Sequence, residues 1–211
     1  MKFYDITRTI TPQTAVWPQV ASPEIETVLQ IQEGFSVNLT QLHLSPHTGT
    51  HADAYFHYEQ EGEHPAKMPL ESYIGHCHVV STHKHNGALL PSDFPILESV
   101  TTLERLLIHT PISDIPHHSF PETFPYLSVQ LLTWLKSKGC VLVGLDSPSV
   151  DALESKTLDC HHALKTLGMV NLEFLDLRHV PDGEYELIAL PLKLDQTCAS
   201  PVRAVLRTLN A

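Results

Sequence analysis

The spacing of apolar and polar residues predicts short strands in the first part of the chain. Residues 3–10 alternate loosely, as in a half-buried strand, and residues 24–31 and 36–44 predict two further strands joined by a hairpin-like link. In the second of these two runs the apolar phase slips by one residue between Leu39 and Leu42. This slip predicts a bulge or a change of face.

Helical spacing first occurs in the second half. Residues 126–138 predict a helix that stops at Gly139, and a second helix begins at Asp159 and ends near Gly168. Short apolar runs predict further strands, at residues 77–80, 105–110, 140–145 and 184–194. Because a helix leads directly into a buried strand, the pattern favours a mixed α/β fold but gives no strand order.

Composition narrows the class of protein. A chain of 211 residues with 42% hydrophobic residues is long enough for one domain, residues 1–211, with a sizeable core. A net charge of −11 and the lack of a basic patch argue against nucleic acid as a partner. The same charge argues against binding to an anionic membrane surface.

The cysteines and the N-terminus indicate the compartment. The four cysteines are widely spaced and form no CxxC pair, so reduced thiols are expected. No signal-peptide pattern begins the sequence, and no apolar stretch reaches the ~18 residues of a membrane-spanning helix. We therefore expect a cytoplasmic enzyme. A Ser-His-Asp hydrolase is disfavoured because no Gly-x-Ser-x-Gly segment occurs.

The densest candidate chemistry lies between residues 45 and 57, where His47, His51, Asp53 and His57 follow one another. In a straight strand the Cα atoms of His47 and His51 would be ~13 Å apart, whereas two ligands of one zinc ion lie within ~4 Å. A tight loop or a helical turn is therefore needed, and Gly49 permits a sharp bend. Asp53 adds an oxygen ligand able to bridge two cations, and His57 is better placed for proton transfer.

The run His47-Thr-Gly-Thr-His51-Ala-Asp53-Ala-Tyr-Phe-His57 resembles the H-x-G-T-H-x-D-A-P-x-H signature of the metal-dependent cyclase family, which bacterial kynurenine formamidases (arylformamidases) typify. Tyr55 departs from the usual proline, which affects loop stiffness but no ligand. The resemblance spans nearly the whole chain. It implies a mixed α/β, swivelling β/β/α-like fold, with a β-barrel-like mixed sheet and a few outer helices, and it implies a homodimer.

The resemblance also implies two distant metal ligands. The family has a histidine near the start of a helix and a glutamate after the following strand, and these positions match His161 and Glu173. Alignment on Gly168 selects His161 over His162, since neighbouring residues differ by ~100° of helix rotation and cannot both face one site. The family usually has glycine after the glutamate, where this chain has Phe174.

The expected activity follows from this resemblance. His47, His51, Asp53, His161 and Glu173 would hold two divalent cations, with Zn²⁺ favoured for an N/O ligand set and Mn²⁺ allowed by availability. The implied substrate is an aryl formamide, N-formyl-L-kynurenine, cleaved to L-kynurenine and formate in tryptophan degradation. Trp17 would line the substrate pocket and stack on the aryl ring. His57 would relay the proton.

Three alternatives stay open. Isatin hydrolases share the family signature, so the substrate could be another cyclic or aryl amide. A non-catalytic metal-binding protein would suit the 15 histidines of the chain. A second metal cluster at His76, His78, His83 and His85 is conceivable, but no Asp, Glu or Cys other than Cys77 lies at ligand spacing, so surface or strand-face histidines are favoured.

Overall fold

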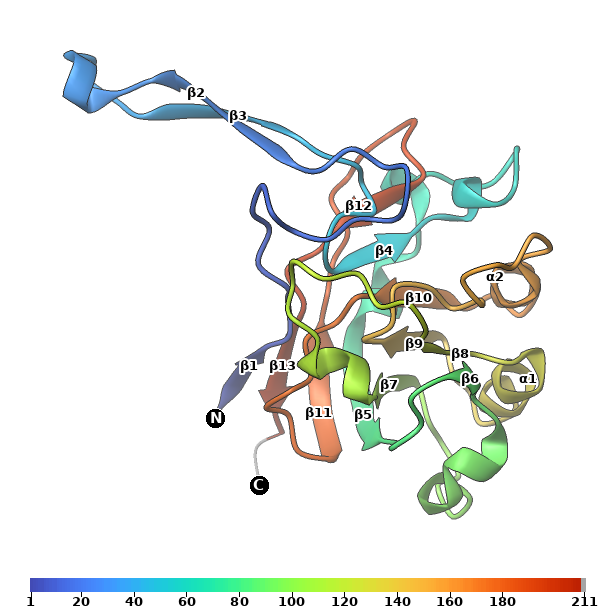
Figure 1. The fold of residues 1–211 in the computed structure, drawn as a ribbon. Coiled ribbons are helices and arrows are strands. Elements are labelled where there is room, and N and C mark those ends of the chain that lie inside the picture. Colours follow the sequence, from blue (N-terminus) through green and yellow to red (C-terminus); the bar gives the residue numbers. More distant parts are fainter. Residues whose placement is uncertain (210–211) are drawn as a thin grey trace.

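The computed structural model describes residues 1–209 and contains a curled mixed sheet of nine strands with two helices on one side (Figure 1). From one edge to the other the strands are β1 (Phe3–Asp5), β13 (Val205–Thr208), β11 (Gly183–Ile188), β5 (Ile74–Ser81), β7 (Arg105–His109), β9 (Leu142–Leu145), β10 (Val170–Glu173), β4 (His51–Asp53) and β12 (Ala199–Pro201). The four central strands, β5, β7, β9 and β10, are parallel, and the others pair antiparallel. The expected mixed α/β fold with a barrel-like sheet is confirmed.

The two helices pack where the parallel strands need crossover connections. α1 (Val129–Ser137) and α2 (Asp159–Thr166) precede β9 and β10, respectively. The predicted first helix is confirmed but starts later, because the Ser128 side chain accepts a hydrogen bond from Leu131 N and caps it. Gly139 ends this helix with φ of 90°.

The sheet has an apolar core on each face, which explains the continuous apolar runs of its central strands. Leucines of α1 pack against the β7 and β9 side chains on one face. The core on the other face includes Tyr73, Leu187 and Leu206. All four residues of β9 are buried, as its sequence predicted.

Two strand predictions extend furthest beyond the strands of the structure. The first strand ends at Asp5, and beyond it only an isolated bridge joins Thr7 to Leu175. β11 ends at Ile188 rather than continuing to residue 194. Past that point Pro191 offers no N–H for a ladder, and the amide of Leu192 donates to the Ser200 hydroxyl instead.

A two-stranded arm, residues 24–43, projects from the body (Figure 1). It consists of β2 (Glu24–Leu29) and β3 (Leu39–His43), so the predicted hairpin is confirmed. The register shifts between Thr27 and Leu29, which places the irregularity on the first strand rather than on the second.

The remaining elements are short. A separate two-stranded sheet pairs β6 (Gly87–Ala88) with β8 (Pro125–Tyr126). Single 3₁₀ turns occupy several connections, at Ile31–Glu33, Tyr55–His57, Pro65–Lys67, Leu70–Tyr73, Pro91–Asp93, Pro95–Leu97 and Pro111–Asp114. Within residues 1–209, neither helix has the length and apolar character needed to cross a bilayer.

Candidate metal centre

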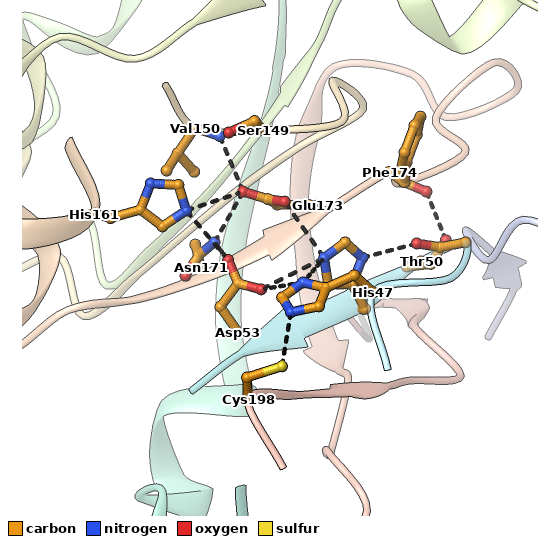
Figure 2. Close-up of polar contacts among 12 residues, drawn as sticks. His47, Thr50, Asp53, Ser149, Val150, His161, Asn171, Glu173, Phe174 and Cys198 are labelled. Carbon is orange, nitrogen blue, oxygen red and sulfur yellow. Dashed lines mark hydrogen bonds and ion pairs between the residues drawn. The ribbon is translucent and has the colours of Figure 1, made fainter. Parts of the chain in front are cut away.

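The predicted ligands come together at the end of the sheet where β4 lies against β10. His51 and Asp53 are the first and last residues of β4, and Glu173 ends β10 directly opposite His51. His161 lies in the first turn of α2, and His47 lies in the turn before β4. Figure 2 shows the side chains of His47, Asp53, His161 and Glu173 turned toward one another. The structure thus groups all five residues, and their role as ligands stays a prediction.

A bend at Gly49 brings His47 back toward β4. Gly49 has φ of 64°, as the spacing of the histidines required, and a Cβ there would lie 3.3 Å from Cγ1 of Ile10. Consequently His47 Nδ1 lies 3.1 Å from His51 Nε2. Of the two predicted alternatives, a tight loop or a helical turn, the structure has the tight loop.

The donor atoms have the spacing of ligands around one cation. His47 Nδ1 and His51 Nε2 lie 3.1 and 3.4 Å from Asp53 Oδ1, and four donors at ~2.1 Å in a tetrahedron would be ~3.4 Å apart. Asp53 Oδ1 is buried and makes no hydrogen bond within the described residues, although two imidazole nitrogens are this close. The three atoms therefore lie as close together as ligands of one cation do, and His47 Nδ1 also lies within hydrogen-bond distance of His51 Nε2, so the grouping fits a metal ion.

Two carboxylates connect a second group of donors to the first. Asp53 Oδ2 lies 3.5 Å from His161 Nε2, on the side opposite to His47. Glu173 places Oε2 3.4 Å from His51 Nε2 and Oε1 3.8 Å from His161 Nε2. Each carboxylate thus turns one oxygen toward each half of the cluster. This is the arrangement that bridges a pair of cations.

Residues that sequence reasoning missed hold these ligands in place. Asp151 accepts a hydrogen bond from His161 Nδ1 at 2.6 Å, which leaves Nε2 free to ligate. Asn171 Nδ2 donates to Asp53 Oδ2 and Glu173 Oε1 at 2.8 and 3.2 Å. In the sequence, Asp151 lies shortly after the apolar run at residues 140–145, and local spacing gives it no role.

Backbone groups and the Cys198 thiol also orient the predicted ligands. His51 Nδ1 lies 2.9 Å from the carbonyl of Gly49, so its Nε2 faces the cluster. The amide of Val150 donates to Glu173 Oε1 at 2.9 Å. His47 Nε2 lies 3.2 Å from Cys198 Sγ, which leaves Nδ1 as its ligating nitrogen. These contacts are drawn in Figure 2.

The shifted pKa values in the cluster show which protons a cation would displace. Burial disfavours the charged form of His51 and His161, but the neighbouring carboxylates outweigh it and raise the pKa of each to about 10. Burial alone would raise the pKa of Asp53, yet contacts with the three imidazoles hold it well below its usual value. Burial, with the nearby Asp53 charge, raises the pKa of Glu173. Imidazolium protons thus balance the carboxylates until a metal displaces them.

A cavity of about 370 Å³ opens beside the cluster. His57 lines it, with its ring centroid 4.2 Å from that of His47 and 5.6 Å from that of His161. Burial lowers the pKa of His57, so its ring is neutral at pH 7. Trp17 lines the same cavity, whereas Tyr55 lies outside it and donates a hydrogen bond to the Met169 carbonyl.

Phe174 stands where the family resemblance leads one to expect glycine, and its backbone conformation is one that glycine favours. Its φ of 52° lies in the left-handed region, which glycine adopts without cost. The backbone is fixed by Phe174 N donating to the Ser147 carbonyl and by Thr50 Oγ1 donating to the Phe174 carbonyl, at 3.0 and 2.6 Å. The ring joins Trp17 and Phe120 in an aromatic wall, with successive centroids 5.5 and 6.0 Å apart.

Comparison with known proteins assigns the family. The Cyclase family model matches residues 4–152. The chain belongs to the Cyclase family. Within curated proteins, this Cyclase-family chain is 41% identical over 210 residues to the kynurenine formamidase of Salinibacter ruber (strain DSM 13855 / M31), and the match covers 98% of each chain.

Solved structures have the same Cyclase-family fold. One, described as a potential metal-dependent hydrolase with cyclase activity, is 26% identical with a TM-score of 0.83, and the match covers 100% of this chain and 99% of that one. Isatin hydrolase A from Labrenzia aggregata is 21% identical, also with a TM-score of 0.83, over 99% of this chain and 94% of its own. At that identity the likeness to the isatin hydrolase shows a shared fold alone.

Proposed function

We propose that this chain is a metal-dependent arylformamidase that hydrolyses N-formyl-L-kynurenine to L-kynurenine and formate, a step of tryptophan degradation. The observation that carries the proposal is a cavity of about 370 Å³ in which an aromatic wall faces the His and carboxylate cluster. An aryl ring fits against Trp17 and Phe174 while its amide reaches the cluster. The 41% identity to a curated kynurenine formamidase supports this substrate.

We further propose that the cluster holds two divalent cations, Zn²⁺ by its N/O donor set, with Mn²⁺ as the alternative. His47, His51 and His161 would ligate through the nitrogens that face Asp53 and Glu173. A divalent ion there makes water nucleophilic at neutral pH and polarises the amide carbonyl. The bridging orientation of both carboxylates supports two ions rather than one.

His57 moves the proton. Its ring is neutral and lies in the cavity against His47 and His161. It accepts the proton of the attacking water and returns it to the aniline nitrogen as the C–N bond breaks. Water thus supplies the hydroxyl of formate, and the leaving amine takes up the proton. Trp17 orients the substrate by stacking on its aryl ring, which contributes roughly 0.5–1.5 kcal/mol beyond the area buried.

The test is turnover of N-formyl-L-kynurenine before and after chelation, with metal content measured in the same samples. We expect activity that chelation removes and that Zn²⁺ or Mn²⁺ restores. The same preparation is then compared on isatin. A higher kcat/KM on isatin would replace the formamidase assignment with an isatin hydrolase, and bound metal without any turnover would indicate a metal-binding protein.

We also propose that the enzyme is a cytoplasmic homodimer joined through the arm. The four cysteines are unpaired, as expected in a reducing compartment. The arm exposes apolar side chains, including Ile25 at 44% and Leu42 at 56%, which face each other across its strands. An isolated two-stranded hairpin is marginally stable in water, so the apolar face of the arm needs another surface packed against it. A second copy supplies it by symmetry, each arm packing on its partner.

The arm is also connected to the cavity, because Val20 and Ser45, at the roots of its two strands, line it. Sedimentation should give a mass near twice 23.6 kDa for the native chain and a monomer for the double variant I25S/L42S. The control E26S/Q41S changes the in-register pair on the opposite face and should stay dimeric. A monomeric native chain, or a dimeric I25S/L42S, would refute the assembly.

A further inference from the structure

A second group of ligating side chains lies on strands β5 and β11. His76 and His78 are two residues apart on β5, so both project from the same face of the sheet. On β11, Glu184 pairs with His78 and Glu186 pairs with His76. The carboxylate that the sequence around these histidines did not provide is thus supplied from the neighbouring strand.

The distances in this group single out Glu184. Its Oε2 lies 2.9 Å from His76 Nε2, and its Oε1 lies 3.8 Å from His78 Nε2. The two imidazole rings have centroids 5.0 Å apart. Glu186 is already paired with Arg207, whereas Glu184 has no lysine or arginine partner within residues 1–209. Two imidazoles and one free carboxylate therefore share one place on the sheet.

His78 indicates that something is missing between these groups. Its side chain is only 12% exposed, its Nδ1 is buried without a hydrogen bond within the part of the chain that is described, and its Nε2 lies 3.8 Å from Glu184 Oε1, beyond hydrogen-bond distance. Buried polar groups normally have a partner, so an unsatisfied imidazole needs an explanation. Burial lowers the pKa of His78, which leaves the ring neutral and able to ligate.

We propose that His76, His78 and Glu184 bind a divalent transition-metal ion at a site separate from the candidate metal centre. Two imidazoles and one carboxylate are a donor set that suits Zn²⁺, and such three-ligand sites keep positions open for water. The ion takes the place of the proton shared by His76 and Glu184 and gives His78 Nε2, which faces Glu184, a partner. Strands β7 and β9 separate β5 from β10, so the two sites are ~14 Å or more apart.

The experiment counts zinc sites on the full chain, stripped by chelation and titrated with Zn²⁺ against a chromophoric zinc indicator. The test variant is H76Q/E184Q, whose two side chains are 37% and 58% exposed in the native protein and do not hold the core together. The control is H83Q/H85Q, which removes two exposed histidines just beyond β5. E184Q alone is the third protein.

The native chain and the control should bind one more ion per chain than H76Q/E184Q, and E184Q alone should weaken that ion. Arylformamidase turnover should be unchanged in all of them, since the site is remote from the cavity. An equal count in native chain and H76Q/E184Q would refute the site. The comparison rests on stoichiometry, so it holds whether or not formylkynurenine proves to be the substrate.

Discussion

Replacing Phe174 tests whether its left-handed backbone is imposed by the fold. The Phe174 backbone is bonded to Ser147 and Thr50, so any substitute must adopt the same φ of 52°. The residue is 4% exposed, its ring lies against Phe120, and the Arg8 guanidinium lies 5.0 Å from the ring centroid. Removing the ring should therefore cost about 3–5 kcal/mol of unfolding free energy in the variant Phe174→Ala.

Phe174→Gly loses the same ring, but glycine adopts the left-handed backbone more readily than alanine does. Glycine escapes the left-handed penalty of about 1–2 kcal/mol and gives back about 0.5–1 kcal/mol through the greater freedom of the unfolded chain. The glycine variant should thus be more stable than the alanine variant by up to about 1.5 kcal/mol, the reverse of the usual order. Urea unfolding of both variants measures the difference. An alanine variant as stable as the glycine variant, or more stable, would refute the argument.

Three further predictions concern charge and proton transfer. His57→Ala should keep its metal and lower kcat by roughly 10²–10⁴-fold, measured by turnover and metal analysis; full activity would remove His57 from the mechanism. Asp151→Asn keeps an oxygen that can cap α2 but weakens the contact with His161. Metal affinity should therefore fall by roughly 10–100-fold. Asp151→Ala also removes the cap, so it should destabilise the fold as well. Burial raises the pKa of Asp176, but Arg178 outweighs it and the net shift is downward from 3.8. The stability that Asp176→Asn loses should therefore be present above about pH 4 and shrink at lower pH, as chemical denaturation would show.

The sequence predicted what depends on local spacing. The bend at Gly49, the helix stops at Gly139 and Gly168, and the buried strand β9 follow from the chemistry of a few neighbouring residues. The ends of strands were less predictable. An apolar run at residues 191–194 continues the pattern of β11, but hydrogen-bond partners decide where pairing ends, and Pro191 has no N–H to offer.

Partners that are distant in sequence were beyond such reasoning. Asn171 contacts both carboxylates of the cluster, yet in the sequence it is an ordinary polar residue within a short strand. The sequence likewise could not predict Glu184 as a partner of His78, because only the antiparallel pairing of β5 with β11 places them opposite each other. Local patterns report the faces of a strand, whereas the choice of neighbouring strand is a property of the whole sheet.

The candidate metal centre depends on sheet register more than on its loops. Glu173 reaches His51 because these residues are paired between β10 and β4, and β4 alternates His51 and Asp53 on one face around a core-facing Ala52. A slip of one residue would turn both β4 ligands into the core and Ala52 toward the cavity. Binding of a cation therefore favours only the native register, so metal occupancy and pairing of these two strands stabilise each other.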